Sequence, residues 1–381
     1  MTVYFVQAIL IVFAGIVSGA DKSRRSKKKF MIFAFSLLII VSALRSRNIG
    51  TDLAIHYADK YEQVARCSWS ELADFAQRTT FEYGYCVFTK LLSVIDPDVQ
   101  FYIAVTSIII YGVLGRFIYR NSEDAVMSTY LLIFSGTYYN YMNIIRQALA
   151  VSVILTGYEV MKKADKKFLR YLVFALFVLL AASFHTASIL CLGFILLDML
   201  KFGKKEMMIG AACTFIFFFM YRQIFETVAS RMSLNRFYME YLTKENESVG
   251  HINLQSIWMF MVVFMAYLIG IYFMVISKGK RHDIRGSVSV QSSFLLFCGM
   301  AASVCRLMVF RMNIINRYSF YFMPFVLLLY PEAINQIHNE NNKRIVLFVM
   351  YSVMVGYFIL MTTMYEASFH RTVPYEFFWQ V

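Results

Sequence analysis

The apolar run FMIFAFSLLIIVSAL at residues 30–44 passes directly into the polar stretch RSRNIGTDLAIHY at residues 45–57. The first part has the composition of a membrane-spanning helix, and the second opens the longest polar segment of the chain. The polar stretch contains two arginines, a Gly-Thr-Asp turn and a histidine–tyrosine pair. Guanidinium groups bind anions, and a carboxylate or an imidazole accepts a proton, so this mixture indicates a functional site.

The whole chain has the composition of a polytopic membrane protein. Of its 381 residues, 59% are hydrophobic and 17% are aromatic. Apolar runs near the roughly 20 residues that cross a bilayer recur along the chain, which excludes a soluble domain. We predict an all-α polytopic membrane protein of about twelve transmembrane helices, forming a single domain over residues 1–381 with both termini outside. The expected spans are 3–19, 30–44, 99–119, 125–141, 145–161, 168–184, 187–200, 206–221, 256–276, 291–309, 318–335 and 345–364.

The positive charge of the chain is interpreted as an orientation signal. The formal net charge is +13, and the basic connectors all fall on one side of the predicted topology. Short basic loops face the cytoplasm, where they also contact anionic lipid, so we expect no nucleic-acid partner. The first apolar run precedes its basic residues, which is the reverse of a cleavable signal peptide, and indicates a retained helix. The connectors are 22–29, 162–170, 201–205, 278–285 and 343–344.

Two long external segments are predicted, at residues 45–98 and 222–255. Residues 83–95 in the first segment are apolar but too short to cross a bilayer, so we expect a re-entrant or interfacial helix there. The second segment is expected to contain an amphipathic interfacial helix followed by a mobile turn. Cys67 and Cys86 share the first segment, where a disulfide between them stays open as an alternative to two thiols.

Several ionisable side chains are predicted at the outer ends of helices. Arg146 and Gln147 start a helix in YYNYMNIIRQALA, and Arg311 and Arg317 lie on either side of MNIIN. Arginine suits a phosphate or pyrophosphate, because its planar fork donates two parallel hydrogen bonds and keeps its charge. We expect these arginines to converge on one cavity at the external face.

Other polar residues allow a structural interpretation. Arg306 and Arg222 are interpreted as interfacial side chains whose charge extends to the lipid headgroups. His185 lies in the short turn SFHTAS, where it is either a functional group or a histidine bound to a backbone carbonyl at a helix end. No Cys/His metal spacing, Walker loop or GxSxG motif occurs, so we expect no metal and no cofactor.

Five motifs occur in order along the chain. They are RNIGTDLAIHY at 47–57, FEYGY at 81–85, NIIRQALA at 143–150, SFHTASIL at 183–190 and NRYSFYF at 316–322. In this combination the sequence resembles the EpsG family of bacterial exopolysaccharide polymerases, which are relatives of the Wzy-type polymerases of O antigen and capsule. The resemblance extends over nearly the whole chain, except that residues 222–255 have no counterpart.

The resemblance implies a GT-C-like helical fold and metal-independent glycosyl transfer in the bacterial cytoplasmic (inner) membrane, with the active face external or periplasmic. The implied substrate is an oligosaccharide repeat unit carried on undecaprenyl pyrophosphate, bound in contact with membrane lipid. A flippase and a chain-length regulator are the candidate protein partners.

This reaction needs groups that stabilise the departing pyrophosphate and a group that accepts a proton. Asp52 is the first candidate for the proton acceptor, followed by His185 and then Glu82. A carboxylate close to several arginines is a weak base, so His185 stays close behind Asp52. The residues expected to bind the substrate are Arg47, Arg146, Arg311, Arg317, His56, Tyr57 and Gln147.

Two other functions compete with the polymerase. A lipid-linked oligosaccharide flippase needs charge along the membrane midplane, whereas the arginines here are predicted at outer helix ends. An integral membrane acyltransferase that modifies the polysaccharide would take its acyl donor from the cytoplasmic side. His185 and Arg146 are predicted on the opposite side, so both alternatives are less well supported.

Overall fold

The computed structural model describes residues 2–20, 22–232, 254–277, 289–311, 315–363 and 370–380. Within these ranges the regular structure is helical and contains no strand, which confirms the all-α prediction. The chain divides into two compact units, unit 1 with Met1–Ile195 and Val346–Val381, and unit 2 with Leu196–Ile345. The single membrane domain over residues 1–381 stays a prediction. Most of the predicted interfacial helix and turn in 222–255 lies outside the described residues.

Unit 1 is built on a series of helices that pack side by side. α2 packs against α6, α6 against α9, and α9 against α10. Glycine permits these close approaches, because a Cβ on Gly115 of α6 would lie 2.7 Å from the Phe35 ring of α2. The elements of unit 1 are α1 (Thr2–Ser18), α2 (Arg24–Ala43), the π-helical turn η1 (Leu53–Tyr57), α3 (Ala58–Arg66), α4 (Leu72–Thr79), α5 (Tyr83–Ile95), α6 (Val99–Asn121), α7 (Ala125–Phe134), α8 (Thr137–Asn143), α9 (Ile145–Lys163), α10 (Lys167–Ala182), the 3-10 turn η2 (Thr186–Leu192), most of α19 (Glu340–Thr363) and the 3-10 turn η6 (Phe378–Gln380).

Unit 2 has its core at the pair α17 and α18, and α15 packs against both of these helices. Phe294 of α17 and Phe325 of α18 meet edge to face with ring centroids 5.2 Å apart. The short helix α11 (Gly193–Met199) crosses the boundary between the units in sequence. The other elements are α12 (Lys204–Met232), α15 (Leu254–Gly270), the π-helical turn η3 (Ile271–Ile276), α17 (Val290–Met308) and α18 (Asn316–Ile334).

The described helices fit a membrane protein, but fewer of them qualify as spans than the sequence predicts. Four are long and apolar enough to cross a bilayer, and the bent pair α8 and α9 would make a fifth. The predicted number of twelve transmembrane helices is not reached by length and hydropathy, because several of the predicted spans are short or interrupted. The four are Val99–Asn121, Ser256–Ile276, Val290–Met308 and Glu340–Thr363.

Two predicted spans are corrected in detail. Residues 125–141 divide into α7 and α8 at Gly136, whose φ of +80° favours glycine and stops the helix. Residues 187–200 form the turn η2 and the short helix α11 in place of one helix. Apolar side chains stay exposed on many helices, including Phe13 and Ile16 of α1 and Phe348 of α19, as expected for contact with lipid.

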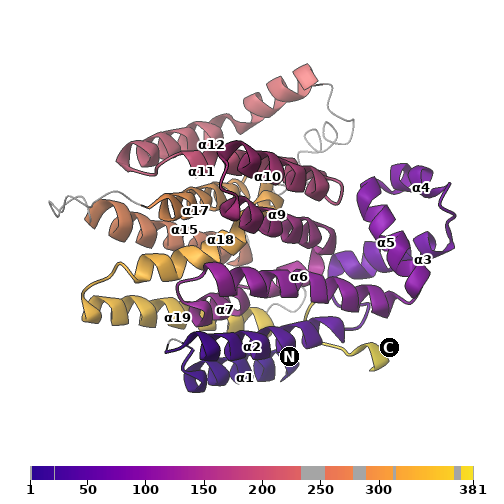
Figure 1. Ribbon diagram of the computed structural model, residues 1–381, viewed down its shortest axis with the longest axis horizontal. Coiled ribbons are helices and arrows are strands. Elements are labelled where there is room, and N and C mark those ends of the chain that lie inside the picture. The colour runs from indigo at the N-terminus through magenta and orange to yellow at the C-terminus, as the bar shows by residue number, and fades with distance from the viewer. Residues whose placement is uncertain are drawn as a thin grey trace. The chain divides into compact units, whose positions relative to one another are not determined.

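The segment 45–98, which was predicted to be external, is folded rather than an open loop. The predicted short helix is confirmed as α5, and α3 and α4, which were not predicted, precede it. Figure 1 shows α3, α4 and α5 grouped together at one end of α6. Their apolar faces meet in a cluster that includes Val64, Leu72, Phe75 and Cys86. The amphipathic helices α3, α4 and α5 therefore form a small helical layer.

The two cysteines of this layer are free thiols, so the disulfide alternative is not supported. Cys86 is buried in the apolar cluster, and Cys67 packs against it. Burial raises the pKa of the Cys86 thiol to about 11, because an apolar environment disfavours the thiolate. Cys86 is therefore an unreactive core residue.

The basic connectors of unit 1 meet at the end of the helices opposite to this layer. Lys27 Nζ, near the start of α2, donates to the Ser122 carbonyl oxygen after α6 at 3.0 Å. Arg120 at the end of α6 forms an ion pair with Glu159 of α9 at 3.3 Å. Residues 22–29, 121–124 and 162–167 thus share one end of unit 1, as the predicted topology requires.

Candidate active site

Arg146 lies at a sharp break between two helices. α8 and α9 are bent by 116°, and Ile144, with φ −86° and ψ 52°, interrupts the helix between them. Arg146 Nη1 forms an ion pair with Glu82 Oε2 at 2.7 Å, and the two side chains are only 15% and 18% exposed. The Arg146 guanidinium carbon lies 4.7 Å from the centre of the Phe81 ring. The break therefore directs Arg146 toward the start of α5.

Glu82 joins three elements of unit 1. Its Oε1 accepts hydrogen bonds from the Thr186 N–H at 2.8 Å and from Thr186 Oγ1 at 3.1 Å, while Oε2 binds Arg146. These bonds hold the start of η2 against α5 and α9. Because both oxygens of Glu82 are engaged, the geometry favours an orienting role for this carboxylate over proton transfer.

Tyr57 connects this group to the polar stretch after α2. It makes a side-chain hydrogen bond with Arg146, and its ring lies 5.9 Å from that of Phe81. Tyr57 ends η1, a π-helical turn, and such turns are frequent at functional sites. We call Tyr57, Phe81, Glu82, Arg146 and Thr186 the Arg146 cluster.

Two buried amides on α8 organise the Gly-Thr-Asp turn. Asn143 Oδ1 accepts the Asp52 N–H at 2.8 Å. Asn140 Oδ1 lies 3.1 Å from His370 Nε2, and the His370 carbonyl oxygen accepts the Thr51 N–H at 2.8 Å. We call Asp52, Asn140, Asn143 and His370 the asparagine cluster. Asp52 directly precedes η1 and Tyr57 ends it, so this turn connects the two clusters along the chain.

Residues 370–380 run beside the polar stretch and hold it in place. The Ser46 N–H donates to the Glu376 carbonyl oxygen at 2.9 Å, and the Phe378 N–H donates to that of Leu44 at 3.0 Å. An isolated antiparallel bridge joins Arg45 and Phe377. The loop after α2 therefore takes its shape from a distant part of the chain.

Arg45 is buried and stabilises this region. Its side chain is 1% exposed, and it donates to the carbonyl oxygens of Ser42 at 2.8 Å and Met142 at 3.0 Å. These bonds tie the end of α2 to α8. We therefore assign Arg45 a structural role.

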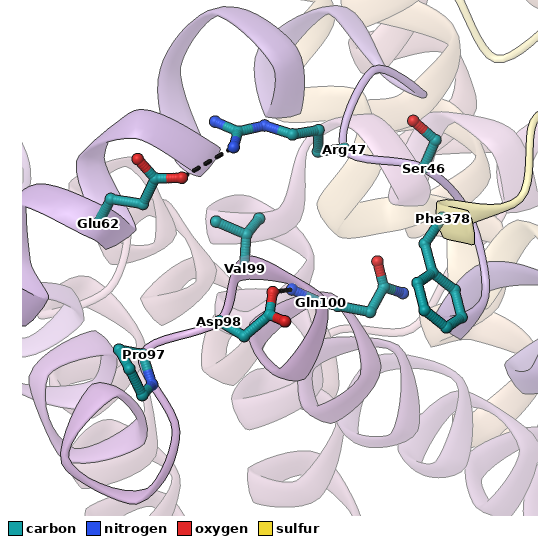
Figure 2. A pocket seen from close by; sticks show the side chains of 8 residues that line it. All are labelled: Ser46, Arg47, Glu62, Pro97, Asp98, Val99, Gln100 and Phe378. Carbon is teal, nitrogen blue, oxygen red and sulfur yellow. Dashed lines mark hydrogen bonds and ion pairs between the residues drawn. The ribbon is translucent and has the colours of Figure 1, made fainter. Parts of the chain in front are cut away.

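Arg47 lines a separate pocket of about 260 Å³, drawn in Figure 2. It forms ion pairs with Asp59 at 2.9 Å and Glu62 at 2.8 Å. Figure 2 also shows Asp98 on the wall of this pocket, where its carboxylate accepts the Gln100 N–H. The acidic groups outnumber Arg47, so the pocket is a poor site for pyrophosphate.

The other predicted arginines belong to unit 2. Arg311 is exposed, with its guanidinium carbon 4.7 Å from the centre of the Phe218 ring, and Arg317 is also exposed. Arg306 is only 4% exposed, and it donates to Asn316 Oδ1 and stacks on the Phe320 ring, so its interpretation as an interfacial side chain is wrong. Since Arg146 belongs to unit 1, the convergence of all these arginines stays a prediction.

Three further predicted residues have different surroundings. His185 is 9% exposed and directly precedes η2, where its carbonyl oxygen accepts the Ser188 N–H. Gln147 is buried at 2% exposure next to Arg146, and His56 of η1 is exposed. In the described part of the chain, no three His, Cys, Asp or Glu side chains group to hold a metal ion.

A profile of the EpsG family matches residues 28–377. The chain belongs to the EpsG family. The matched range contains the Arg146 cluster and the asparagine cluster, including His370. Neither the curated proteins nor the solved structures gave a significant match to the chain. Membership in the EpsG family suggests an exopolysaccharide polymerase-like role in a membrane.

Part of this candidate site was not predicted from the sequence. Asn140 and Asn143 were visible only as amides in YYNYMN, and nothing local marks Thr186 as a partner of Glu82. His370 follows the last predicted span and carries no motif. Its position depends on a contact with Asn140, which is 230 residues away.

Proposed function

We propose that this EpsG-family chain is a polysaccharide polymerase. It joins oligosaccharide repeat units carried on undecaprenyl pyrophosphate at the external face of the bacterial cytoplasmic membrane, in exopolysaccharide, capsule or O-antigen synthesis. The proposal includes a GT-C-like fold with about twelve crossings, some made by short or broken helices. Metal-independent glycosyl transfer is the proposed reaction.

The observation that carries the proposal is the Arg146 cluster inside a family match of nearly full length. Arg146 is a mostly buried guanidinium at a helix start, at the end of unit 1 opposite to the basic connectors. A partly desolvated arginine binds a diphosphate more strongly than an exposed one, because water competes less for its hydrogen bonds. This placement supports an external site for a lipid-linked diphosphate.

The proposed reaction moves the growing chain from its carrier to the incoming unit. A sugar hydroxyl oxygen forms a bond to the anomeric carbon, and the bond from that carbon to the diphosphate oxygen breaks. The electron pair leaves with the diphosphate, and the hydroxyl proton passes to a base. We propose that Arg146 stabilises the departing charge, and that Gln147, His56 and Tyr57 contact the substrate. The convergence of Arg317 and Arg311 on the same substrate stays a prediction.

Glu82 sets how Arg146 would act. The carboxylate holds Arg146 in place before substrate binds, and an arriving diphosphate competes with it for the guanidinium. Glu82 keeps its two hydrogen bonds to Thr186 during that exchange. In this arrangement Arg146 is oriented in advance, which lowers the cost of ordering it around the substrate.

Replacing Arg146 by Ala tests the proposal. We expect polymer to fall about 100- to 1,000-fold, because the departing charge loses one strong donor. Single repeat units should accumulate on the lipid carrier, measured by gel analysis of extracted lipid-linked sugars. The matched control is Arg24→Ala, an exposed arginine at the opposite end of unit 1, which should leave chain length unchanged. Normal polymer in Arg146→Ala, with normal insertion, would contradict the role of Arg146.

Deleting the gene separates the competing functions. A polymerase leaves single units on the carrier at the external face, and a flippase leaves them at the cytoplasmic face. An acyltransferase leaves polymer of normal length that lacks the modification. Either of the last two results would reject the polymerase.

A further inference from the structure

We propose that the pocket drawn in Figure 2 binds one sugar unit of the lipid-linked oligosaccharide. The inference rests on the proposed polymerase function and adds a place for the sugar, apart from the Arg146 cluster that is proposed to hold the diphosphate. The pocket belongs to unit 1 and lies at the start of α6, at the end opposite to the basic connectors. Its lining residues are Ser46, Arg47, Glu62, Pro97, Asp98, Val99, Gln100 and Phe378.

The pocket has the size and the mixed lining of a small-ligand site. Its volume of about 260 Å³ is close to the lower end of the roughly 300–1,000 Å³ that is typical of such sites, so it suits one sugar unit rather than a whole oligosaccharide. Figure 2 shows Glu62 on one side and Phe378 on the other, with Asp98 and Gln100 between them. These residues come from α3, from the start of α6 and from η6, so a bound sugar would contact three segments that are distant in the sequence.

Three oxygen atoms of the lining are available to accept hydrogen bonds from sugar hydroxyl groups. Glu62 binds Arg47 through Oε1, and Asp98 accepts the Gln100 N–H through Oδ1. Gln100 Nε2 donates to the Ala43 carbonyl oxygen, so Oε1 of the same amide is the atom without a bond. Within the described part of the chain, no hydrogen bond is made by the remaining oxygens Glu62 Oε2, Asp98 Oδ2 and Gln100 Oε1.

The donor in the pocket is held in place before a ligand arrives. Arg47 forms ion pairs with Asp59 at 2.9 Å and with Glu62 at 2.8 Å. A guanidinium has more N–H donors than these two ion pairs use, so Arg47 can also donate to a sugar oxygen. Because the ion pairs already order the Arg47 side chain, less conformational entropy is lost when the sugar binds.

Phe378 gives the polar pocket an apolar side. It is 41% exposed, and its backbone N–H donates to the Leu44 carbonyl oxygen at 3.0 Å, which fixes its position. A sugar ring has an apolar C–H face in addition to its hydroxyl groups. Covering the Phe378 ring with that face removes apolar surface from water while the hydroxyl groups bind the polar side of the pocket.

The charge of the pocket disfavours two other kinds of ligand. Glu62 and Asp98, together with Asp59 beside Arg47, outnumber the single guanidinium, so a phosphate group or an acidic sugar would be repelled. A metal ion is also disfavoured, because no three His, Cys, Asp or Glu side chains of the described residues group together. A sugar without negative charge is the ligand that fits these groups.

Replacing Phe378 tests the apolar side of the pocket. Phe378→Ala removes the ring, whereas Phe378→Tyr keeps it. The matched control is Trp379→Ala, because Trp379 is 58% exposed, contacts the Phe378 ring and does not line the pocket. If these aromatic side chains only contact the membrane interface, the two alanine variants will behave alike.

Replacing Asp98 tests the polar side. Asp98→Asn keeps an oxygen that accepts the Gln100 N–H at the start of α6, but it removes the negative charge from the pocket. A hydrogen bond to a charged acceptor is stronger than one to a neutral amide, so sugar binding should weaken. The matched control is Asp74→Asn, an exposed carboxylate on α4.

The assay uses membranes that carry each full-length variant, with the lipid-linked repeat units that accumulate in a strain lacking the gene. We expect Phe378→Ala to raise KM about tenfold and Asp98→Asn about fivefold, with kcat within about twofold of wild type, as for the loss of binding that substrate and transition state share. Phe378→Tyr and both controls should keep KM within about twofold. An unchanged KM in Phe378→Ala would overturn the proposal, and so would an equal rise in Trp379→Ala.

A binding measurement separates this inference from the proposed function. The probe is the free oligosaccharide that mild acid releases from the lipid carrier, and its binding to the purified protein in detergent is followed by saturation-transfer NMR. Binding that is lost in Phe378→Ala and kept in Trp379→Ala supports the pocket. If wild-type membranes nevertheless extend no chains, only the polymerase reaction is rejected. If wild type extends chains and Phe378→Ala binds the free oligosaccharide as wild type does, only the pocket is rejected.

Discussion

Gly50 shows how much of the site depends on one backbone conformation. Its φ is +101°, and its N–H donates to the Arg371 carbonyl oxygen at 3.2 Å. A Cβ at this position would lie 3.5 Å from Asn143 Oδ1, which is an ordinary contact. Backbone strain, rather than crowding, therefore requires glycine here.

We predict that Gly50→Ala lowers the free energy of unfolding by about 1–3 kcal/mol and reduces polymer, because it strains the turn that holds residues 370 and 371. Thermal unfolding of the purified protein in detergent measures the first effect. Gly112→Ala in α6 is the control, since a Cβ there meets nothing within 4 Å and φ is ordinary. An unchanged unfolding temperature in Gly50→Ala would contradict the argument.

At the scale of the element, a lysine from another helix caps the C-terminal end of α3. Lys90 of α5 is 7% exposed, and its Nζ donates to the carbonyl oxygens of Val64 at 3.2 Å, Ala65 at 3.1 Å and Cys67 at 2.6 Å. The last carbonyl groups of a helix have no partner within it, and a cation there also opposes the negative end of the helix dipole. Lys90 therefore joins α3 to α5.

We predict that Lys90→Met destabilises the helical layer α3–α5 by roughly 2–3 kcal/mol, because three carbonyl groups lose a charged donor. Limited proteolysis with trypsin in detergent should then cut faster at Arg66 and Arg78. Lys60→Met, which removes a lysine whose ammonium group donates to Gln63 on its own helix, is the control. Equal cleavage rates in both variants would count against this cap.

Single elements were predictable where the signal is local. The bounds of α5 and the start of α6 follow from Glu82, from Asp96-Pro97-Asp98 and from the apolar runs between them. The break before α9 was predicted, since the expected spans 125–141 and 145–161 lie on either side of Ile144, but the angle of 116° between α8 and α9 was not.

The candidate site was predictable to a similar extent. Glu82, Arg146 and Tyr57 were each selected from sequence, and the structure brings them together. Their pairing was not visible, since Glu82 and Arg146 are 64 residues apart. His370 was missed because its hydrogen bonds to Asn140 and Thr51 join it to residues that are far away in the sequence.

At the scale of the molecule, unit 1 has two chemically distinct ends. Lys22–Lys29 and the residues around Lys163 lie at one end, while both clusters of the candidate site lie at the other. Positive charge favours the cytoplasmic side, so this separation supports an external site.

We predict that His56→Cys reacts with a membrane-impermeant maleimide in intact spheroplasts, whereas Lys166→Cys reacts only after lysis. Both positions are exposed and lie at opposite ends of unit 1. The wild-type chain, with its six cysteines, gives the background. Labelling of Lys166→Cys in intact cells, with His56→Cys protected, would invert the topology.

The pairing of residues 370–380 with the loop after α2 also has a consequence for biosynthesis. Tyr375 donates to the Val41 carbonyl oxygen at 2.8 Å, although 334 residues separate them. At typical translation rates the ribosome needs about 20–70 s to synthesise the residues between them. During this interval the early loop is already outside the ribosome without its partner. A nascent chain in the membrane therefore cannot complete this site until its last helix has been inserted.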